Sequence, residues 1–176
     1  MSQIKVDSIV PRAGLPAGAN GGIIQVVSTT KTNTFTTSAT SPTNVTGMAV
    51  TITPPSASHK ILIICQISGA ANSRYIGLRM ARSTTPLAIG DEEGNRTRAA
   101  FTPGSNPSAS SDAAILRVMG MHWLDSPNTT SATTYNLQAW IPYSTATFFL
   151  NEPAFDANDT YIIKGISSLT AMEVSV

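Results

Sequence analysis

The stretch TTYNLQAWIP, residues 133–142, decides the fold class of this chain. Apolar or aromatic side chains stand at Tyr135, Leu137, Ala139 and Ile141, and Thr134, Asn136, Gln138 and Trp140 stand between them. A period of two is that of a β-strand with one buried and one exposed face. Because Met48–Thr53 and Arg74–Arg82 alternate in the same way, we expect several strands of this kind.

Further strands are predicted along the chain, separated by turns rich in Gly, Pro, Asn and Ser. Lys60–Ser68 is almost continuously apolar, so we expect it to be a central strand covered on both faces. Leu87–Ile89 is a candidate edge strand. The other predicted strands are Ile23–Thr30, Thr34–Thr37, Ala114–Leu124, Thr147–Leu150, Tyr161–Ile166 and Leu169–Val176. About ten strands without helical periodicity predict an all-β fold, an antiparallel two-sheet sandwich of jelly-roll type.

The first 22 residues differ from the rest of the chain. A short alternating apolar segment, Ile4–Val10, is followed by a stretch with two prolines and four glycines, which favours neither helix nor strand. Such a leader cannot build a core of its own. We therefore predict an extended N-terminal anchoring arm at residues 1–22 and a β-sandwich domain at residues 23–176. The arm would add a strand to a sheet edge of another protein, and its attachment residues would be Ile4, Lys5, Val6, Asp7 and Ile9.

The composition excludes several partner classes. Charged residues make up 12% of the chain, against about 25% in ordinary domains, and the net charge is only +1. Such a chain has no field that would attract nucleic acid or an anionic membrane. The longest apolar run, Ile61–Cys65, is too short to insert into a membrane, and the N-terminus lacks the apolar core of a signal peptide. We expect synthesis in a cytoplasm without general secretion.

Residues that could carry catalysis are few. His59 and His122 have no Cys or second His at ligand spacing, so we expect neither a metal site nor a cofactor. Asp125 could orient His122, although packing of this histidine beside Trp123 is the simpler interpretation. No Gly-x-Ser-x-Gly motif marks a serine nucleophile. The single cysteine, Cys65, lies in an apolar strand and is expected to be a buried thiol. The sequence therefore predicts no enzyme.

Two loops are candidates for contact with other molecules. Asp91–Asp112 is the longest irregular region, and a loop of this length in a compact domain is usually functional or mobile. Its carboxylates favour a solvated turn over a calcium site, because their spacing matches no EF-hand pattern. Glu152–Asn158 is the second loop. The candidate surface-contact residues are Asp91, Glu92, Glu93, Asn95 and Arg96.

Aromatic residues leave an alternative open. Trp123, Trp140 and Tyr143 could stack on sugar rings, which would make the domain a carbohydrate-binding module for host surface glycan. Packing in the core explains most of the aromatic side chains more simply. An enzyme that degrades host polysaccharide is a third hypothesis, but no pair of acids lies in a recognisable context for it.

Several blocks of sequence resemble tail-fibre and other virion proteins of marine phages, especially cyanophages. The blocks are characteristic as a set, and together they extend over most of the chain. They are Ile4–Ile9, Gly22–Phe35, Pro54–Ile64, Ala88–Asp91, Leu124–Pro127 and Leu169–Val174. The resemblance implies a β-sandwich structural protein on the outside of a phage particle, often trimeric, with no catalytic residues to carry over.

These observations predict a non-enzymatic virion structural protein that is anchored through its N-terminal arm. A tail fibre or fibre tip and a capsid decoration protein are the two placements that we expect. The expected partners are other virion proteins, capsid or tail, and further copies of the chain, most simply a trimer. The expected location is the virion, after synthesis in the host cytoplasm.

Overall fold

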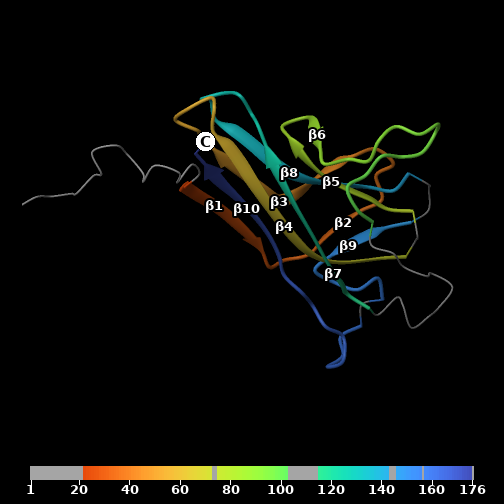
Figure 1. Cartoon of the computed structure of the whole chain (residues 1–176). Helices are drawn as coiled ribbons and strands as arrows, with labels where there is room; N and C mark the ends of the chain where they lie inside the picture. Colours follow the sequence, from red (N-terminus) through yellow and green to blue (C-terminus); the bar gives the residue numbers. More distant parts are fainter. Residues whose placement is uncertain (1–21, 73–74, 103–114, 143–145, 156, 176) are drawn as a thin grey trace, which may run out of the picture.

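The computed structural model describes residues 22–72, 75–102, 115–142, 146–155 and 157–175. These residues form ten strands in two antiparallel sheets, which confirms the predicted all-β sandwich (Figure 1). The strands are β1 (Ile23–Lys31), β2 (Phe35–Thr37), β3 (Thr43–Ile52), β4 (Lys60–Ala71), β5 (Gly77–Arg82), β6 (Thr85–Leu87), β7 (Arg117–Asp125), β8 (Thr133–Trp140), β9 (Phe148–Leu150) and β10 (Ser167–Val174).

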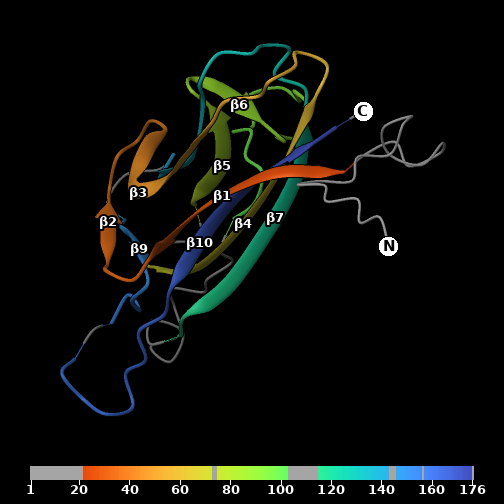
Figure 2. The ribbon, with the colours of Figure 1, turned by 90° about the vertical axis from the view of Figure 1, so that its left-hand side faces the viewer.

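The order of the strands is that of a jelly roll. In the small sheet the order is β3-β8-β5-β6. In the large sheet β4 pairs with β10 on one side and with β7 on the other, and β10 pairs with β1. Successive strands therefore cross repeatedly between the sheets, as the Greek-key connections of a jelly roll require. Figure 2 shows β1, β10, β4 and β7 side by side.

The short strands β2 and β9 continue the large sheet beyond β1 and β10. Asn151 joins these segments, because its side-chain NH₂ donates to the carbonyls of Lys31 (2.8 Å) and Asn33 (2.9 Å). Its side-chain oxygen accepts from the Ser167 hydroxyl at 2.6 Å. Asn151 is fully buried and has φ of +65°, a left-handed conformation that asparagine adopts more readily than most residues. Asn151 therefore provides hydrogen-bond partners for backbone carbonyls at the junction of β1 and β2, and it also binds the first residue of β10.

The core lies between the sheets and is built from alternate residues. On β4 these are Ile61, Ile63, Cys65 and Ile67. They belong to one apolar cluster with Tyr135, Leu137 and Ala139 of β8. The other large members of the cluster include Met48, Ile52, Leu78, Met80, Ile141, Phe148 and Leu150. Side chains of this size contribute about 1.5–3 kcal/mol each when they are withdrawn from water. The alternation in residues 133–142 thus predicted the core-facing side of β8 correctly. The expectation that the other side is exposed was wrong, because Asn136, Gln138 and Trp140 are also buried.

Three expectations about strands need correction. Residues 161–166 form a loop and not a strand, and β10 begins at Ser167. The edge strand near residue 87 is Thr85–Leu87 and not Leu87–Ile89. Pro86 has no N–H to donate, and an edge strand tolerates this because one of its sides has no neighbouring strand. The expectation that Lys60–Ser68 is covered on both faces was wrong, because Ile64 and Gln66 are exposed. Runs of apolar residues do not distinguish a strand covered by its own chain from one with an open apolar face.

The sandwich has two distinct ends. The backbones of Gly22 and Ser175 are hydrogen-bonded, which places the start of β1 beside the end of β10 and near Lys60, the first residue of β4. The last residue of β4, Ala71, pairs instead with β9. The segment that follows β9 and the described part of the 91–102 loop lie away from Gly22 (Figure 1). The chain therefore enters at one end, and both candidate contact loops lie toward the other.

Candidate interaction surface

The outer face of the large sheet is the most unusual surface of the described residues. Strand register places side chains in rows across β1, β10, β4 and β7. The first row is entirely apolar, and the next two are mixed but uncharged apart from one histidine. The rows are Val26-Met172-Leu62-Leu124, Ser28-Thr170-Ile64-His122 and Thr30-Ser168-Gln66-Gly120. We call these three rows the apolar face.

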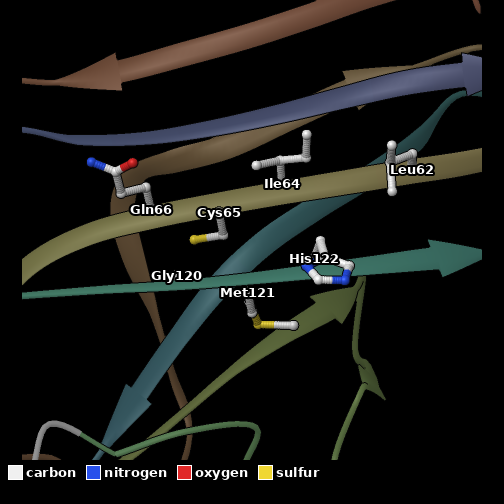
Figure 3. Close-up of a pocket in the computed structure, with 7 residues that line it drawn as sticks. All are labelled: Leu62, Ile64, Cys65, Gln66, Gly120, Met121 and His122. Atoms are coloured by element: carbon white, nitrogen blue, oxygen red, sulfur yellow. The ribbon is translucent and has the colours of Figure 1, made fainter.

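Several side chains of the apolar face are well exposed. Val26 is 53% exposed, Ile64 41% and Leu124 48%, although β4 lies in the middle of the sheet. Neighbouring residues of β4 point in opposite directions, so Ile64 and Gln66 lie on the outside while Cys65 points inward (Figure 3). Isolated exposed apolar residues are ordinary, but a contiguous group of them usually marks an interaction site.

A groove interrupts the apolar face between β4 and β7. Its volume is about 350 Å³, and Ile64, Gln66, Gly120 and His122 are among its lining residues (Figure 3). Gly120 contributes no side chain, which leaves the space open in the third row. A Cβ added at Gly120 would meet nothing closer than the Cys65 carbonyl oxygen at 3.5 Å, so the local backbone does not require glycine.

A second apolar hollow continues the apolar face beyond Gly120. Its volume is about 500 Å³, and it lies where the loop before β10 approaches the start of β7. Val118 is the outward-facing residue of β7 at this point, opposite Ser68 of β4. The hollow is lined mainly by apolar side chains, which include Ile115, Val118, Tyr161 and Ile163. The apolar surface therefore extends from the Gly22 end of the sheet to this loop.

The five attachment residues of the predicted arm, Ile4, Lys5, Val6, Asp7 and Ile9, lie outside the described residues. The arm therefore stays a prediction.

The five candidate surface-contact residues lie together on an exposed loop. Asp91, Glu92, Glu93, Asn95 and Arg96 are all exposed, and Arg96 forms an ion pair with Glu93 one turn earlier in the loop. Residues 103–112 of the same loop lie outside the described part of the chain. Over the described residues, no three His, Cys, Asp or Glu side chains gather as a metal site would require.

The two histidines occupy different environments. His122 projects outward from β7, whereas Asp125 is buried and accepts hydrogen bonds from Arg82 (2.9 Å) and Tyr135 (2.7 Å). Residues three apart on a strand point to opposite faces, so the suggested contact between Asp125 and His122 was wrong. Burial, and then the hydrogen bond to Asp125, raise the pKa of the Tyr135 phenol.

His59 has a partner that the sequence did not indicate. Its Nδ1 lies 2.6 Å from a carboxylate oxygen of Glu173, and Gln25 donates to the other oxygen at 2.6 Å. Glu173 is fully buried, so these two contacts satisfy a carboxylate that would otherwise be costly. The strand alternation around residue 173 could have indicated an inward-facing acid, but the loop that brings His59 to it could not be predicted.

The aromatic residues do not form one sugar-stacking surface. Trp140 is only 3% exposed and lies on the small sheet, where Arg79 stacks 5.3 Å from its ring centroid. Trp123 is 42% exposed on β7 of the large sheet. Tyr143 lies outside the described residues. The predicted buried thiol is confirmed, because Cys65 is only 1% exposed, and this burial raises its pKa to about 12.

No protein-family model matches the chain, and no curated protein is similar to it at a significant level. In the part of the chain that the structure describes, no helix has the length and apolar character needed to span a membrane.

Proposed function

We propose that the protein is a non-enzymatic structural component of a phage particle, displayed on the particle surface and attached through its N-terminal arm. The observation that carries this proposal is that the two ends of the sandwich differ. The described chain enters at Gly22, beside Ser175, and the two loops with candidate contact residues lie toward the opposite end (Figure 1). A domain held at its entry end would project those loops away from the anchoring point.

The sequence supports the same role. Its resemblance to virion proteins of marine phages includes the arm segment Ile4–Ile9 and the start of β1. The apolar face adds a surface suited to permanent assembly, since long-lived interfaces are more apolar than ordinary protein surface. A tail fibre or fibre tip and a capsid decoration protein both need these properties, and both remain within the proposal.

The test is the amount of this protein in purified phage particles, measured by quantitative mass spectrometry against the major capsid protein. A simple fraction of the capsid copy number places the protein over the shell as decoration. A few copies per particle place it on a tail fibre. Its complete absence from the particle would contradict the proposal.

A deletion of residues 1–22 tests the arm separately. We expect the remaining domain to fold, because its core residues all lie between Val45 and Ala171, and to lose binding to particles. The fold is checked by circular dichroism before the binding measurement. Incorporation of the shortened protein at the normal level would show that attachment does not depend on the arm.

Carbohydrate binding is the second function, and the exposure of Trp123 is the observation that favours it among the described aromatic residues. Loss of glycan-array binding in Trp123→Ala, with an unchanged fold, would support it. Trp140→Ala is the wrong variant for this purpose, because Trp140 is covered by its own chain.

A further inference from the structure

We propose that the apolar face is covered by a second copy of this chain, so that the protein is a homo-oligomer built by packing the large sheets against each other. This inference deepens the proposed function, on which it rests for the expectation that the protein works in an assembly. It assigns one surface and one partner to that assembly.

The distribution of exposed apolar side chains selects this surface. Thirteen large apolar side chains are exposed in the described residues, and eight of them belong to the outer side of the large sheet or to the adjoining hollow. The other five are scattered over the loops, β7 and the bulge in β1. The eight are Ile23, Val26, Ile64, Ile115, Val118, Leu124, Tyr161 and Ile163. A concentration of this kind is typical of a covered surface and not of a solvated one.

The charge of the face favours a copy of itself as the partner. A face whose charges are mostly of one sign brings like charges together when it packs on a copy of itself, so such faces oppose self-association. Across the three rows His122 is the only ionisable side chain, and Lys60 lies beyond them beside Val174. A charged partner surface would leave its own charges buried without counter-ions here. Another copy of the chain offers an uncharged surface in equal amount.

The shape of the face also allows it to pack on a copy of itself. A ridge formed by Leu62, Leu124 and Ile64 lies beside the groove over Gly120. In a two-fold interface each copy contributes the same patch, so the ridge of one copy can enter the groove of the other. His122 lines that groove, where its imidazole can donate to or accept from a polar group such as Gln66 of the second copy.

The area of the face can be compared with that of a standard interface. Four strands about 4.8 Å apart and three rows about 6.6 Å apart give a flat face of roughly 380 Å². Protruding side chains and the hollow around Val118 and Ile163 enlarge the accessible area beyond this value. A standard interface buries about 800 Å² on each partner, and homodimer interfaces are more apolar than average. The flat area of the apolar face is about half of this value, and the protruding side chains and the hollow add to it.

The experiment is sedimentation equilibrium of the full-length protein and two variants at micromolar concentration. We expect the unmodified protein to sediment at twice its chain mass of 18.4 kDa or more. Ile64→Glu places a charge at the centre of the face, and we expect it to sediment at the mass of one chain. Thr51→Glu is the matched control, because Thr51 is an exposed strand residue on the outer face of the small sheet. It should keep the mass of the unmodified protein.

Circular dichroism establishes that each variant is folded, and Leu124→Glu replaces Ile64→Glu if the latter fails to fold. An unmodified protein that sediments as one chain would overturn the inference, and so would an oligomer that survives Ile64→Glu and Leu124→Glu unchanged. These outcomes are distinguishable from failure of the proposed function. A single-chain protein that still enters phage particles contradicts only the homo-oligomer, and an oligomer absent from particles contradicts only the virion role.

Discussion

The outer faces of the two sheets differ sharply, although the strands that form them alternate in the same way. On the small sheet the outward side chains satisfy one another: Thr51 and Thr134 are 2.8 Å apart, and Gln138 donates to Asn44 at 2.9 Å. Arg79 completes the surface by donating to Gln138 and stacking on Trp140. On the large sheet most of the corresponding positions are apolar or carry small hydroxyl groups, and Gln66 and His122 are the larger polar side chains of the three rows.

This difference shows that a strand pattern can specify a covered face without specifying what covers it. Most outward polar groups of the small sheet have partners within one chain, and the buried side-chain oxygen of Asn136 is an exception. On the large sheet, the apolar face is open to water in the single chain. We infer that assembly with a second copy of the chain withdraws the apolar face from water. Paired substitutions, one for each surface, test the comparison.

The largest effect is expected for Ile63→Ala, with Ile64→Ala as its matched control. The two residues are neighbours on β4, but Ile63 is fully buried in the core and Ile64 lies on the apolar face. Truncation of a buried isoleucine costs about 2–5 kcal/mol of unfolding free energy. Ile64→Ala should cost less than about 1 kcal/mol in the dissociated chain. Urea denaturation measures both, and equal losses would contradict the assignment of the two faces.

A second pair compares two glycines. A Cβ at Gly77 would clash with the Trp140 ring, so Gly77→Ala must displace the tryptophan and its stacked arginine. We expect it to destabilise the chain by about 1–3 kcal/mol. Gly120→Ala meets only ordinary contacts and should be neutral or slightly stabilising. Thermal unfolding measures the stability of both variants. A loss of stability in Gly120→Ala as large as that in Gly77→Ala would contradict the description of the groove.

A smaller effect is expected for Arg79→Ala on the outer face of the small sheet. The substitution removes the hydrogen bond from Nε to Gln138 and the stacking on Trp140. Each interaction is worth about 1 kcal/mol at a partly exposed site, so the expected loss of unfolding free energy is about 1–2 kcal/mol. The oligomeric mass should not change. A variant that dissociates the protein would show that the small sheet also takes part in assembly.

The smallest effect concerns the native thiol. Cys65 is adjacent to Ile64 but points into the core, where burial raises its pKa to about 12. At pH 8 the reactive thiolate is therefore almost absent, and we expect no reaction with a thiol reagent until the protein is unfolded in urea. Rapid labelling of the folded protein would place Cys65, and with it the inner face of β4, in contact with solvent.

The amino-acid pattern predicted the fold class and most strands because the alternation of residues is local. Residues 133–142 and 48–53 each carry their own signal, and their buried sides were read correctly. The segment 161–166 is apolar yet forms a loop, since its side chains line the hollow beside β7 and its backbone pairs with none of the described strands. Its sequence alone does not reveal this difference.

The candidate surface was harder to predict than the fold. Each row of the apolar face combines residues from four strands, such as Val26, Met172, Leu62 and Leu124, which are far apart in the sequence. Only the register of the sheet brings them together. The continuous apolar run in β4 is the available signal, and it predicts coverage within the chain, which the exposed Ile64 contradicts. The attachment arm was predicted from the first 22 residues, and this prediction still awaits the deletion experiment.

The most direct test of the covered face is the rate of thiol labelling at position 64 in the assembled, full-length protein. Cysteine is introduced in Ile64→Cys and, as the control, in Thr51→Cys on the small sheet, with the native thiol silent in both. The account predicts that the thiol at position 64 reacts at least about tenfold more slowly than the thiol at position 51, and that dissociation by dilution restores its reactivity. Equal labelling rates at the two positions would contradict the account, because the apolar face would then be open to water.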